Sequence, residues 1–465
     1  MSTAAPEFTQ WTRHPEATRL IENRLDYFCG QNNFLADLRH RLLTGTGTRL
    51  IDWVDTIHFA DATLLEKTGF TDQDPVGVAG RFHHPGAQLP FVVNEGAARV
   101  VLRVDSVVDF LRAQAILQPA AGDASPDYGL SEGISIAGLP DATRRSALVS
   151  SLGGVEVSVL ERHGDLGSET IGEDVQHFDL ATFVQSEQSL RLRPRQFSDP
   201  VEGLEKTIAL VQLIVKDLGA DLACDLFFRT EREYWQLRND AAELQYRAQS
   251  LLGFGWANHD HHTYRSSRRC FAPLIALLEL LGMQCRERFY AGADAGWGAQ
   301  VLEQPRARIV VFADVDMTAD EVLGDFAHEG LSEAETRGTV GLWCHLHGEA
   351  VLQAGMHHLE CQFDFEAARE RLSAQGTDSL NPFTYFEHLK QSFTRGQVWP
   401  VHPRTIETAL ARGGINAEQA QRFRTAGATG SHLEVLERNE GYKGFNQTGI
   451  SDIIARTDPR NAEFS

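Results

Sequence analysis

Residues 258–267 read Asn258-His259-Asp260-His261-His262-Thr263-Tyr264-Arg265-Ser266-Ser267, directly after the glycine-rich bend Gly253-Phe254-Gly255. Three histidines, an aspartate and an arginine therefore fall within ten residues. Histidine accounts for only 18 of the 465 residues, so this local density is unusual. Neutral imidazole is the commonest protein ligand for metal ions. The stretch predicts a metal site, and the competing interpretation is a polar surface loop.

Alternation along a strand divides the side chains of this stretch between two faces. In an extended strand, every second side chain lies on the same face. The set on one face consists of His259, His261, Thr263 and Arg265. The set on the other face consists of Asp260, His262 and Tyr264. The first face would therefore carry a metal ligand and, just past Thr263, a fixed cation. That combination suits the binding of an anionic substrate beside a metal.

Length and composition restrict the class of protein. A chain of 465 residues exceeds one ordinary core, so two or three domains are expected. A hydrophobic content of 42% with 26 phenylalanines indicates large packed cores. The net charge of -21 argues against nucleic acid and against an anionic membrane surface, because both recruit surplus lysine and arginine. A small anionic substrate stays compatible if arginines are concentrated locally.

Cysteine usage and apolar runs indicate the compartment. The six cysteines form no CxxC pair and are too sparse for a disulfide scaffold. The first residues show neither the basic nor the apolar region of a signal peptide. The longest apolar run, Phe271 to Met283, contains Glu279 and is shorter than a membrane span. These features predict a soluble cytoplasmic protein.

The first part of the chain contains segments with different patterns of apolar residues. Apolar spacing predicts helices over residues 16–44, and short β-like runs follow over 50–111. Residues 120–140 have the composition of a long loop, and 154–160 that of a strand. Residues 199–219 are expected to form a helix with an Asp-Pro start and a Gly stop. The capping-box pattern Thr230-Glu231-Arg232-Glu233 predicts the start of a helix running to about Leu252. A domain boundary is therefore placed at residue 230, giving domains 1–230 and 231–465.

The second part repeats one theme, which is a strand that begins with histidine, then a helix, then further strands. The first unit is expected to contain a helix at 268–283, strands at 297–302 and 308–314, and a helical stretch at 318–355. The second unit has a strand at 356–365, a helix at 366–372 and a strand at 430–438. His261 and His358 lie at the two strand openings, and Glu434 lies on the closing strand. Two histidines and one carboxylate form a facial triad that suits non-haem Fe(II).

Residues 256–465 resemble the vicinal oxygen chelate superfamily, and within it most closely the 2-oxoadipate dioxygenase/decarboxylase family. The 4-hydroxyphenylpyruvate dioxygenases are similar at a greater distance. The motifs that carry the resemblance are His261-His262-Thr263-Tyr264-Arg265, His357-His358-Leu359 with Phe363-Asp364, Leu433-Glu434-Val435-Leu436-Glu437-Arg438 and Gly441-Tyr442-Lys443-Gly444-Phe445-Asn446. The order and spacing of these motifs support the resemblance more strongly than any single motif does. The first 230 residues show no such resemblance.

The resemblance implies an α+β fold in which paired βαβββ modules form a half-open barrel. The residues before this region are expected to form a separate N-terminal α/β domain. The resemblance also implies Fe(II) held by His261, His358 and Glu434. Arg265 would be the catalytic arginine that binds a substrate carboxylate, and Thr263 would also contact the substrate. The implied activity is Fe(II)-dependent dioxygenation and decarboxylation of a small 2-oxo acid similar to 2-oxoadipate, with O₂ as the second substrate. Arginine suits a bidentate carboxylate contact that lysine would not reproduce.

Several ligand assignments stay open at this point. His259 or His262 could replace His261, and His357 could replace His358. Glu437 competes with Glu434, although a separation of three residues places it on the opposite face of a strand. The HxH pair His345 and His347 falls within a predicted helix, where the two side chains diverge by ~200°. These two are expected either to contact the metal ligands from outside or to pack in the core.

Other classes of function remain as alternatives. A metal-dependent hydrolase or isomerase would use the HxH of His259 and His261. A non-catalytic protein would use the same fold to bind a small ligand. The N-terminal part is expected either to cover the site or to form a homodimer, and the sequence does not choose between them. No nucleic acid or membrane partner is expected.

Overall fold

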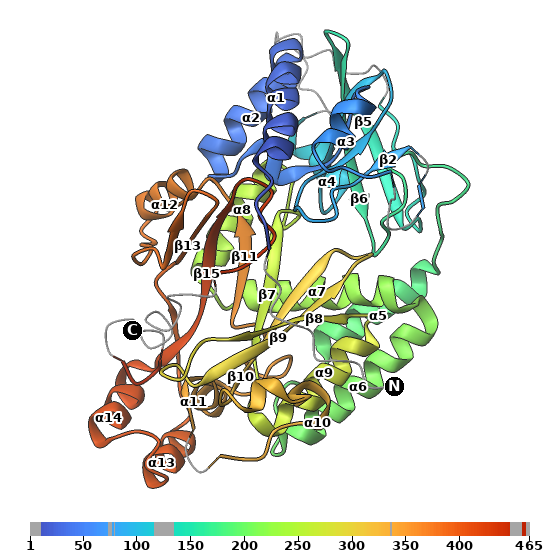
Figure 1. Ribbon diagram of the computed structural model, residues 1–465. Coiled ribbons are helices and arrows are strands. Elements are labelled where there is room, and N and C mark those ends of the chain that lie inside the picture. The colour runs from blue at the N-terminus through green and yellow to red at the C-terminus, as the bar shows by residue number, and fades with distance from the viewer. Residues whose placement is uncertain are drawn as a thin grey trace.

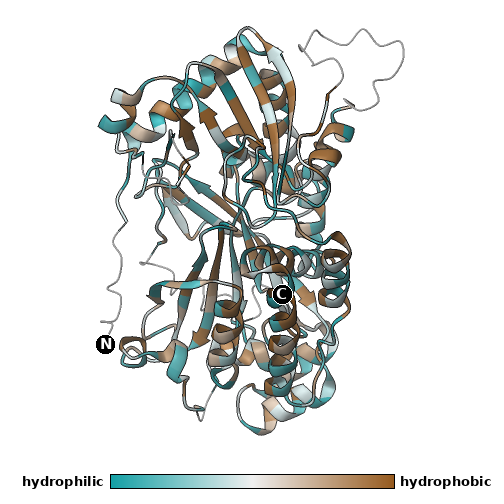
Figure 2. Ribbon diagram, turned by 90° about the vertical axis from the view of Figure 1, so that its right-hand side faces the viewer, coloured by the Kyte–Doolittle hydropathy of each residue, from teal (hydrophilic) through white to brown (hydrophobic). Residues whose placement is uncertain are grey.

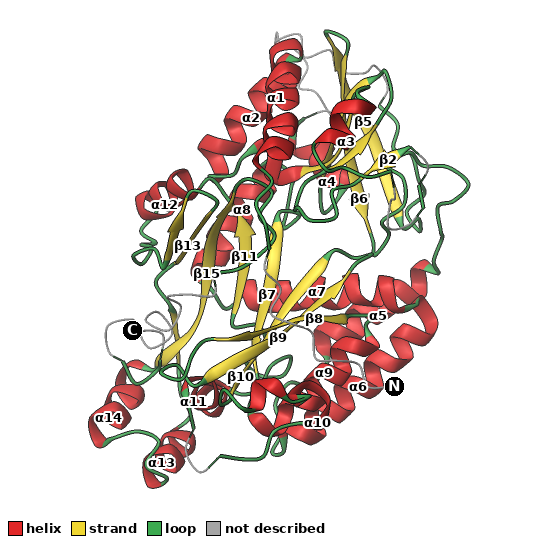
Figure 3. Ribbon diagram, viewed as in Figure 1, coloured by secondary structure: helices red, strands yellow, loops and turns green. Residues whose placement is uncertain are grey.

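Two mixed β-sheets, one in each half of the chain, form the framework of the protein (Figure 1). Helices pack around both sheets, as the red and yellow ribbons of Figure 3 show. The computed structural model describes residues 11–72, 77–78, 80–115, 134–334, 337–446 and 458–461. Among these residues neither sheet closes into a barrel.

The N-terminal sheet has six strands in the order β2-β3-β1-β4-β6-β5. The strands are β1 (Val54–His58), β2 (Arg81–Phe82), β3 (Phe91–Val93), β4 (Ala98–Arg103), β5 (Arg144–Leu152) and β6 (Val155–Arg162). The central pair, β1 and β4, is antiparallel, and β1 and β4 have β3 and β6 as parallel neighbours. A helix follows each central strand, α3 (Ala62–Lys67) after β1 and α4 (Val107–Ala113) after β4. The sheet therefore consists of two similar units placed back to back.

Helices α1 (Pro15–Gln31) and α2 (Asn33–Thr46) share a core with this sheet. Asn32 ends one helix and begins the next. Its side chain accepts a hydrogen bond from Leu35 N and donates one to Val155 O on β6 at 3.0 Å. A helix start and a sheet strand are thereby fixed by one buried amide. A short 3-10 turn, Leu50–Trp53, leads into β1.

Four helices connect the two sheets. They are α5 (Leu180–Leu192), α6 (Pro200–Leu218), α7 (Ala220–Gln236) and α8 (Asp240–Leu251). Phe227 and Phe228 of α7 are fully buried in the same core as the C-terminal strands and α9 (Arg268–Leu280). Brown apolar segments accordingly line the inner faces of helices and strands in Figure 2.

The C-terminal sheet has nine strands, eight of them in the order β12-β13-β15-β11-β7-β10-β9-β8, with β14 paired to β15. In chain order, the first four strands of this sheet are β7 (His259–Arg265), β8 (Gln284–Tyr290), β9 (Trp297–Gln304) and β10 (Ile309–Asp316). The others are β11 (His358–Gln362), β12 (Thr384–Phe386), β13 (Leu389–Phe393), β14 (Gln397–Trp399) and β15 (Ala428–Arg438).

Two successive units make up this sheet. One runs β7-α9-β8-β9-β10, and the other runs β11, α12 (Phe365–Ala374), β12, β13 and β15. In each unit the last strand lies parallel beside the first. The two first strands, β7 and β11, pair antiparallel in the middle of the sheet. The beginnings of the two units therefore meet at one place.

The remaining helices pack around this sheet, with α11 (Thr339–His347) against β7, β10 and β15. These helices are α10 (Phe326–Glu329), α11, α13 (Pro403–Ala411) and α14 (Ala417–Ala426), and a second 3-10 turn spans Glu321–Leu323. Figure 1 shows α13 and α14 together at one corner, in orange-red. They enclose a small apolar cluster of their own that includes Ile406 and Phe423.

Most elements expected from sequence are confirmed. Helix α6 begins after Asp199, whose side chain accepts from Val201 N, and ends at Gly219. The helices expected at 16–44, 268–283 and 366–372 correspond to α1 with α2, α9 and α12. The strands that open with His261 and His358 and close with Glu434 are β7, β11 and β15. The loop expected at 120–140 lies mainly outside the described residues.

The helix start expected at Thr230 is wrong. Helix α7 begins at Ala220, and the Thr230 hydroxyl donates to Phe227 O at 2.8 Å in the middle of that helix. The break comes at Asn239, whose side chain accepts from Ala242 N and caps α8. Thr230, Glu231 and Arg232 are instead buried by packing, which overrides a local signal. The division into domains 1–230 and 231–465 stays a prediction.

The helical stretch expected at 318–355 is also mostly wrong. Only short helices form there, because glycines interrupt the pattern, with Gly330 and Gly348 at φ values of +74° and +98°. Strand β8 was not expected, since its sequence is polar and its burial comes from pairing with β9.

All six cysteines are free thiols. Among the described helices, none is long and apolar enough to cross a membrane.

Helix α11 carries a histidine whose burial generates a pH prediction. His347 is 3% exposed, and its Nε2 faces Thr429 O at 3.0 Å. Burial lowers the pKa of His347 from 6.5 to about 3. The unfolded chain therefore binds a proton between these values that the folded chain does not, and stability present above pH 6.5 is lost as the pH falls through this window.

We expect His347→Gln to flatten the decline in the free energy of unfolding between pH 6 and 4 by about 1.4 kcal/mol per pH unit. Glutamine retains an amide donor for Thr429 O but does not titrate. Urea unfolding of the metal-free protein at several pH values measures the slope. Equal slopes for the wild type and the variant would show that His347 does not contribute to acid lability.

Candidate metal centre

Strand β7 presents His261, Thr263 and Arg265 to one buried cavity. The antiparallel register with β11 places Glu360 opposite His261 and His358 opposite Thr263. Because the two strands run in opposite directions, His261 and His358 occupy equivalent places in their units. The sheet therefore brings the two histidines together from positions almost one hundred residues apart in the chain.

The parallel register of β15 with β11 adds the carboxylate. Glu434 stands opposite Glu360, and the Glu434 Oε2 lies 3.3 Å from the Nε2 of His358. His261, His358, Glu360 and Glu434 each offer a ligand atom, and these atoms all lie within 4.8 Å of one another. All four side chains are buried. Three adjacent strands of the sheet thus supply two imidazoles and two carboxylates to one point.

The side of the cluster that faces β10 is apolar. Phe312 of β10 stands opposite Thr263, as Glu434 of β15 stands opposite Glu360. The equivalent of Glu434 in the first unit is therefore a phenylalanine, which cannot bind a metal. Further aromatic rings line the same cavity of about 80 Å³, namely Phe289, Trp297, Phe383, Phe393 and Phe445. This asymmetry leaves one side of the cluster free of protein ligands.

The flanking histidines of β7 do not join the cluster. His262 points to the opposite face, where it lies 3.1 Å from Nη1 of Arg232 and packs against Phe228. His259 departs from regular alternation, because the β7–β11 register shifts beside it, and its ring lies 5.2 Å from that of His262. Of the three candidates on β7, the structure brings only His261 to His358 and Glu434.

The second pair of alternative ligands, His357 and His358, lies close together. His357 and His358 both line the cavity, with their Nδ1 atoms 2.8 Å apart. His357, His358 and His432 form a further group of close ligand atoms, beside the first one. Only His358 belongs to both groups. His357 contacts the ring of Trp343, and its group contains no carboxylate. The group with Glu360 and Glu434 therefore has the more suitable charge for a divalent cation.

Glu437, His345 and His347 lie away from the cluster. Glu437 accepts from Phe365 N at 2.8 Å and pairs with Lys390 on the other face of β15. His345 and His347 face the backbone oxygens of Thr405 and Thr429 from α11. A third group of potential ligands, Glu279, Cys285 and His328, lies at the surface, where His328 is already paired with Glu279 and Asp325.

Burial controls the charge of the four clustered groups. It lowers the pKa of His261 to about 4 and that of His358 well below its ordinary value, so both imidazoles are neutral and able to ligate a metal. Burial raises the pKa of Glu434 to about 7 and that of Glu360 well above its usual range. Two adjacent buried carboxyl groups cannot both ionise without a cation.

The donor set fits a divalent transition metal. Glu360 Oε2 is buried and accepts no hydrogen bond among the described residues, although it lies close to the Nδ1 of His261. A cation bound between the carboxylates would compensate that oxygen and favour ionisation of both groups. Two imidazoles with carboxylate oxygens suit Fe(II), and equally Mn, Co or Zn.

Asp260 supports the cluster from behind. Its Oδ1 lies 3.1 Å from the Nδ1 of His261, and its two oxygens accept from the guanidinium of Arg438 at 3.0 Å each. Burial opposes ionisation of Asp260, but the charge of Arg438 holds the pKa of this carboxyl well below its ordinary value. Carboxylates that contact a ligating histidine fix the orientation of its ring.

Arg265 and Thr263 lie further along the same face. The Arg265 side chain is buried, and its Nε and Nη1 have no hydrogen-bond acceptor among the described residues. Its guanidinium carbon lies 5.7 Å from the centre of the Trp343 ring, and Asp314 is the neighbour on β10. Burial raises the pKa of Asp314 to about 8, and Arg265 opposes that rise. Arg265 is therefore a buried cation with free donors at the cavity wall.

Sequence reasoning missed Glu360 and Asp260. Glu360 follows His358 by two residues on a strand, so alternation alone places it on the same face. Asp260 was assigned to the face opposite His261, yet its carboxylate reaches the ring of its neighbour. The signal for Glu360 was present in the motif His358-Leu359-Glu360, whereas the ring contact of Asp260 depends on Arg438 and was not readable.

No protein-family model and no curated protein matches the chain. Among solved structures, a mutant 4-hydroxymandelate synthase from Streptomyces coelicolor is 13% identical over 70% of this chain and 90% of that one, with a TM-score of 0.30. Methylmalonyl-CoA epimerase from Mycobacterium tuberculosis is 14% identical over 39% of this chain and 88% of that one, with a TM-score of 0.23. Protein YdcJ from Shigella flexneri is 13% identical over 61% and 84%, with a TM-score of 0.24. These TM-scores are too low for inference about function, which rests on the side-chain geometry.

We expect Asp260→Asn to lower the free energy of unfolding by about 3–5 kcal/mol, because it leaves the buried Arg438 without its counter-charge. Glu366→Gln is the matched control, because Glu366 is half exposed and its ion pair with Arg369 is longer, at 3.7 Å. Denaturant unfolding of the metal-free protein measures both values. A loss for Asp260→Asn no larger than that of the control would contradict the role of this ion pair.

Proposed function

We propose that this protein is a non-haem Fe(II)-dependent dioxygenase/decarboxylase that acts on a small 2-oxo acid similar to 2-oxoadipate. The observation that carries the proposal is the convergence of His261, His358 and Glu434 at a buried point beside Arg265, whose Nε and Nη1 have no acceptor among the described residues. The sequence resemblance of residues 256–465 supplies the reaction class. In this interpretation the two units of the C-terminal sheet are the βαβββ modules of a half-open barrel.

Each residue has a stated role. His261, His358 and Glu434 would hold the metal, with Asp260 orienting His261. Bound Fe(II) would supply O₂ activation and the redox chemistry of oxidative decarboxylation. Glu360 either becomes a further ligand or accepts a proton near the bound substrate. The phenylalanine walls exclude water from the reacting groups.

Arg265 would bind a substrate carboxylate. Its free guanidinium donors face the same cavity as the clustered ligands, on the strand that carries His261. A guanidinium binds a carboxylate through two parallel hydrogen bonds, and burial strengthens this contact because water does not compete. Thr263, between His261 and Arg265 on the same face, is placed to contact the bound acid.

The proposal extends to partners and organisation. The substrates are a small anionic 2-oxo acid and O₂, and a reducing cytoplasmic compartment accords with six free cysteines. One sheet in each half accords with two domains, and the division into domains 1–230 and 231–465 stays a prediction. A homodimer stays a prediction that follows from the sequence alone.

A redox-neutral isomerase is the second candidate, and Glu360 is the observation that favours it. Four protein ligands would leave fewer open positions on a metal than three, which suits proton transfer better than simultaneous binding of substrate and O₂. The hydrolase alternative based on His259 and His261 loses its basis, because His259 lies away from the cluster.

Metal analysis after anaerobic purification tests the ligand set. We expect about one iron per wild-type chain and its loss in His261→Ala, His358→Ala and Glu434→Ala. His345→Ala is the matched control, because this histidine lies outside the cavity, and it should retain iron. Retention of full iron by any of the three cluster variants would remove that residue from the set. Zinc in place of iron would favour the isomerase.

Arg265→Lys tests the substrate contact. We expect turnover of a 2-oxo acid, measured as O₂ consumption, to fall by about tenfold to a hundredfold, because lysine cannot make the bidentate contact. The iron content should be unchanged. Unchanged turnover with unchanged iron would rule out the assigned role of Arg265.

A further inference from the structure

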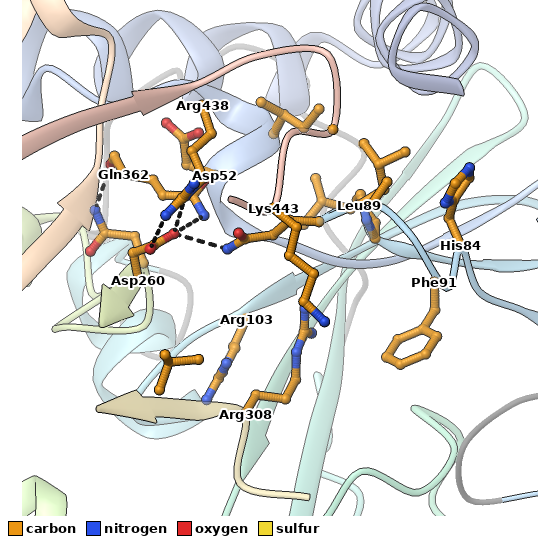
Figure 4. Close-up of a pocket in the computed structure, with 18 of the residues that line it drawn as sticks. Asp52, His84, Leu89, Phe91, Arg103, Asp260, Arg308, Gln362, Arg438 and Lys443 are labelled. Carbon is orange, nitrogen blue, oxygen red and sulfur yellow. Dashed lines mark hydrogen bonds and ion pairs between the residues drawn. The ribbon is translucent and has the colours of Figure 1, made fainter. Parts of the chain in front are cut away.

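A second and larger cavity of about 390 Å³ lies between the two sheets. Its walls come from both halves of the chain, including β3 and β4 on one side and β8, β9, β10 and β15 on the other. A volume of this size is typical of a small-molecule site. Figure 4 shows charged side chains from both sheets directed into this space, with apolar Phe91 and Leu89 beside them.

Arg103, at the end of β4, is the first unsatisfied cation in this cavity. Among the described residues it makes no hydrogen bond and no ion pair, and it lines the cavity directly. Burial and the nearby charge of Arg308 lower the pKa of Arg103 to about 10. Arg103 is only partly buried, and a cation beside a like charge is unfavourable unless an anion compensates it.

Arg308 is the second cation, and its backbone is held in a strained conformation. It precedes β10 with a φ of +55°, a region that residues other than glycine seldom adopt. Its Nη1 lies 3.5 Å from Asp55 Oδ1. Asp55 is already bonded by both the Nε and the Nη2 of Arg162, at 3.1 and 2.9 Å. One carboxylate therefore serves two guanidinium groups, and the charge of Arg308 is only partly balanced.

Lys443, in the segment after β15, is the third cation. Its Nζ lies 3.9 Å from Glu303, and Glu303 is shared with Arg286 at 3.2 Å. In Figure 4 the Lys443 side chain extends toward Arg308. Burial and the charges of Arg286 and Arg308 lower the pKa of Lys443.

The other charges that line the cavity do not supply the missing anion. Asp52 is bonded to Arg49, and Asp260 is bonded to Arg438. Glu22 is exposed at the rim. In a chain with a net charge of -21, three undercompensated cations around one cavity are a local exception. They come from three separate elements, so they converge only in the folded chain.

We propose that this inter-sheet cavity binds a small polyanion, with two or more carboxylates or a phosphate group, between Arg103, Arg308 and Lys443. Guanidinium groups bind carboxylates and phosphates bidentately, and the ammonium of Lys443 adds a point charge. The site is distinct from the metal cavity, although Phe445 lines both. The Phe445 ring packs 5.2 Å from that of His261, so one side chain separates the polyanion site from the candidate metal ligands.

Isothermal titration of the metal-free full-length protein tests this proposal. The probes are citrate, succinate and inorganic phosphate, with sodium chloride at matched ionic strength as the reference. We expect saturable binding of at least one probe, weakened at least about tenfold in Arg103→Met and in Arg308→Met. Circular dichroism checks that each variant folds, and Lys443→Met is the replacement if either does not. A preference for phosphate or for the carboxylates identifies the class of ligand.

Two controls locate the binding. Arg112→Met, at a side chain that is 70% exposed on α4, should bind as the wild type does. Arg265→Met should also retain binding, because Arg265 belongs to the metal cavity. Loss of binding in Arg265→Met alone, or no saturable binding of any probe, would overturn the proposal. Since no metal is present in the titration, the result is independent of the dioxygenase proposal, and either can fail alone.

Discussion

The antiparallel pairing of β7 with β11 is the constraint on which the candidate site depends. It sets Glu360 opposite His261 and His358 opposite Thr263, and the parallel strand β15 then sets Glu434 beside Glu360. A shift of this register by one residue would turn every one of these side chains to the other face. The candidate metal ligands are therefore positioned by backbone hydrogen bonds between strands and not by loops.

Burial gives these side chains their reactivity and also makes them costly. Neutral imidazoles and protonated carboxyl groups are the forms that a dry cavity favours. A divalent cation would reverse the cost for the carboxylates, so occupancy by metal and stability of the site are linked. The pair Asp260–Arg438 solves the same problem without a metal, because each group carries the counter-charge of the other. The inter-sheet cavity differs, since Arg103 has no such partner among the described residues.

The sequence predicted the C-terminal site better than the frame around it. The convergence of His261, His358 and Glu434 could be anticipated from alternation on strands and from the order of the motifs, and their role as ligands stays a prediction. Thr230 misled, because a capping-box pattern is local and the burial of α7 overrode it. Glu360 follows His358 by two residues, so alternation on a strand already places it on the same face. Arg103 and Arg308 could not be paired from the sequence, since they meet only where two distant sheets face each other.

Anomalous X-ray diffraction at the iron edge, from crystals loaded anaerobically with Fe(II), tests the central claim most directly. The account predicts one strong peak within bonding distance of His261, His358 and Glu434, and it shows at the same time whether Glu360 is a ligand. A peak at His357 and His432, a peak at the surface group around Cys285, or no peak at all would contradict it.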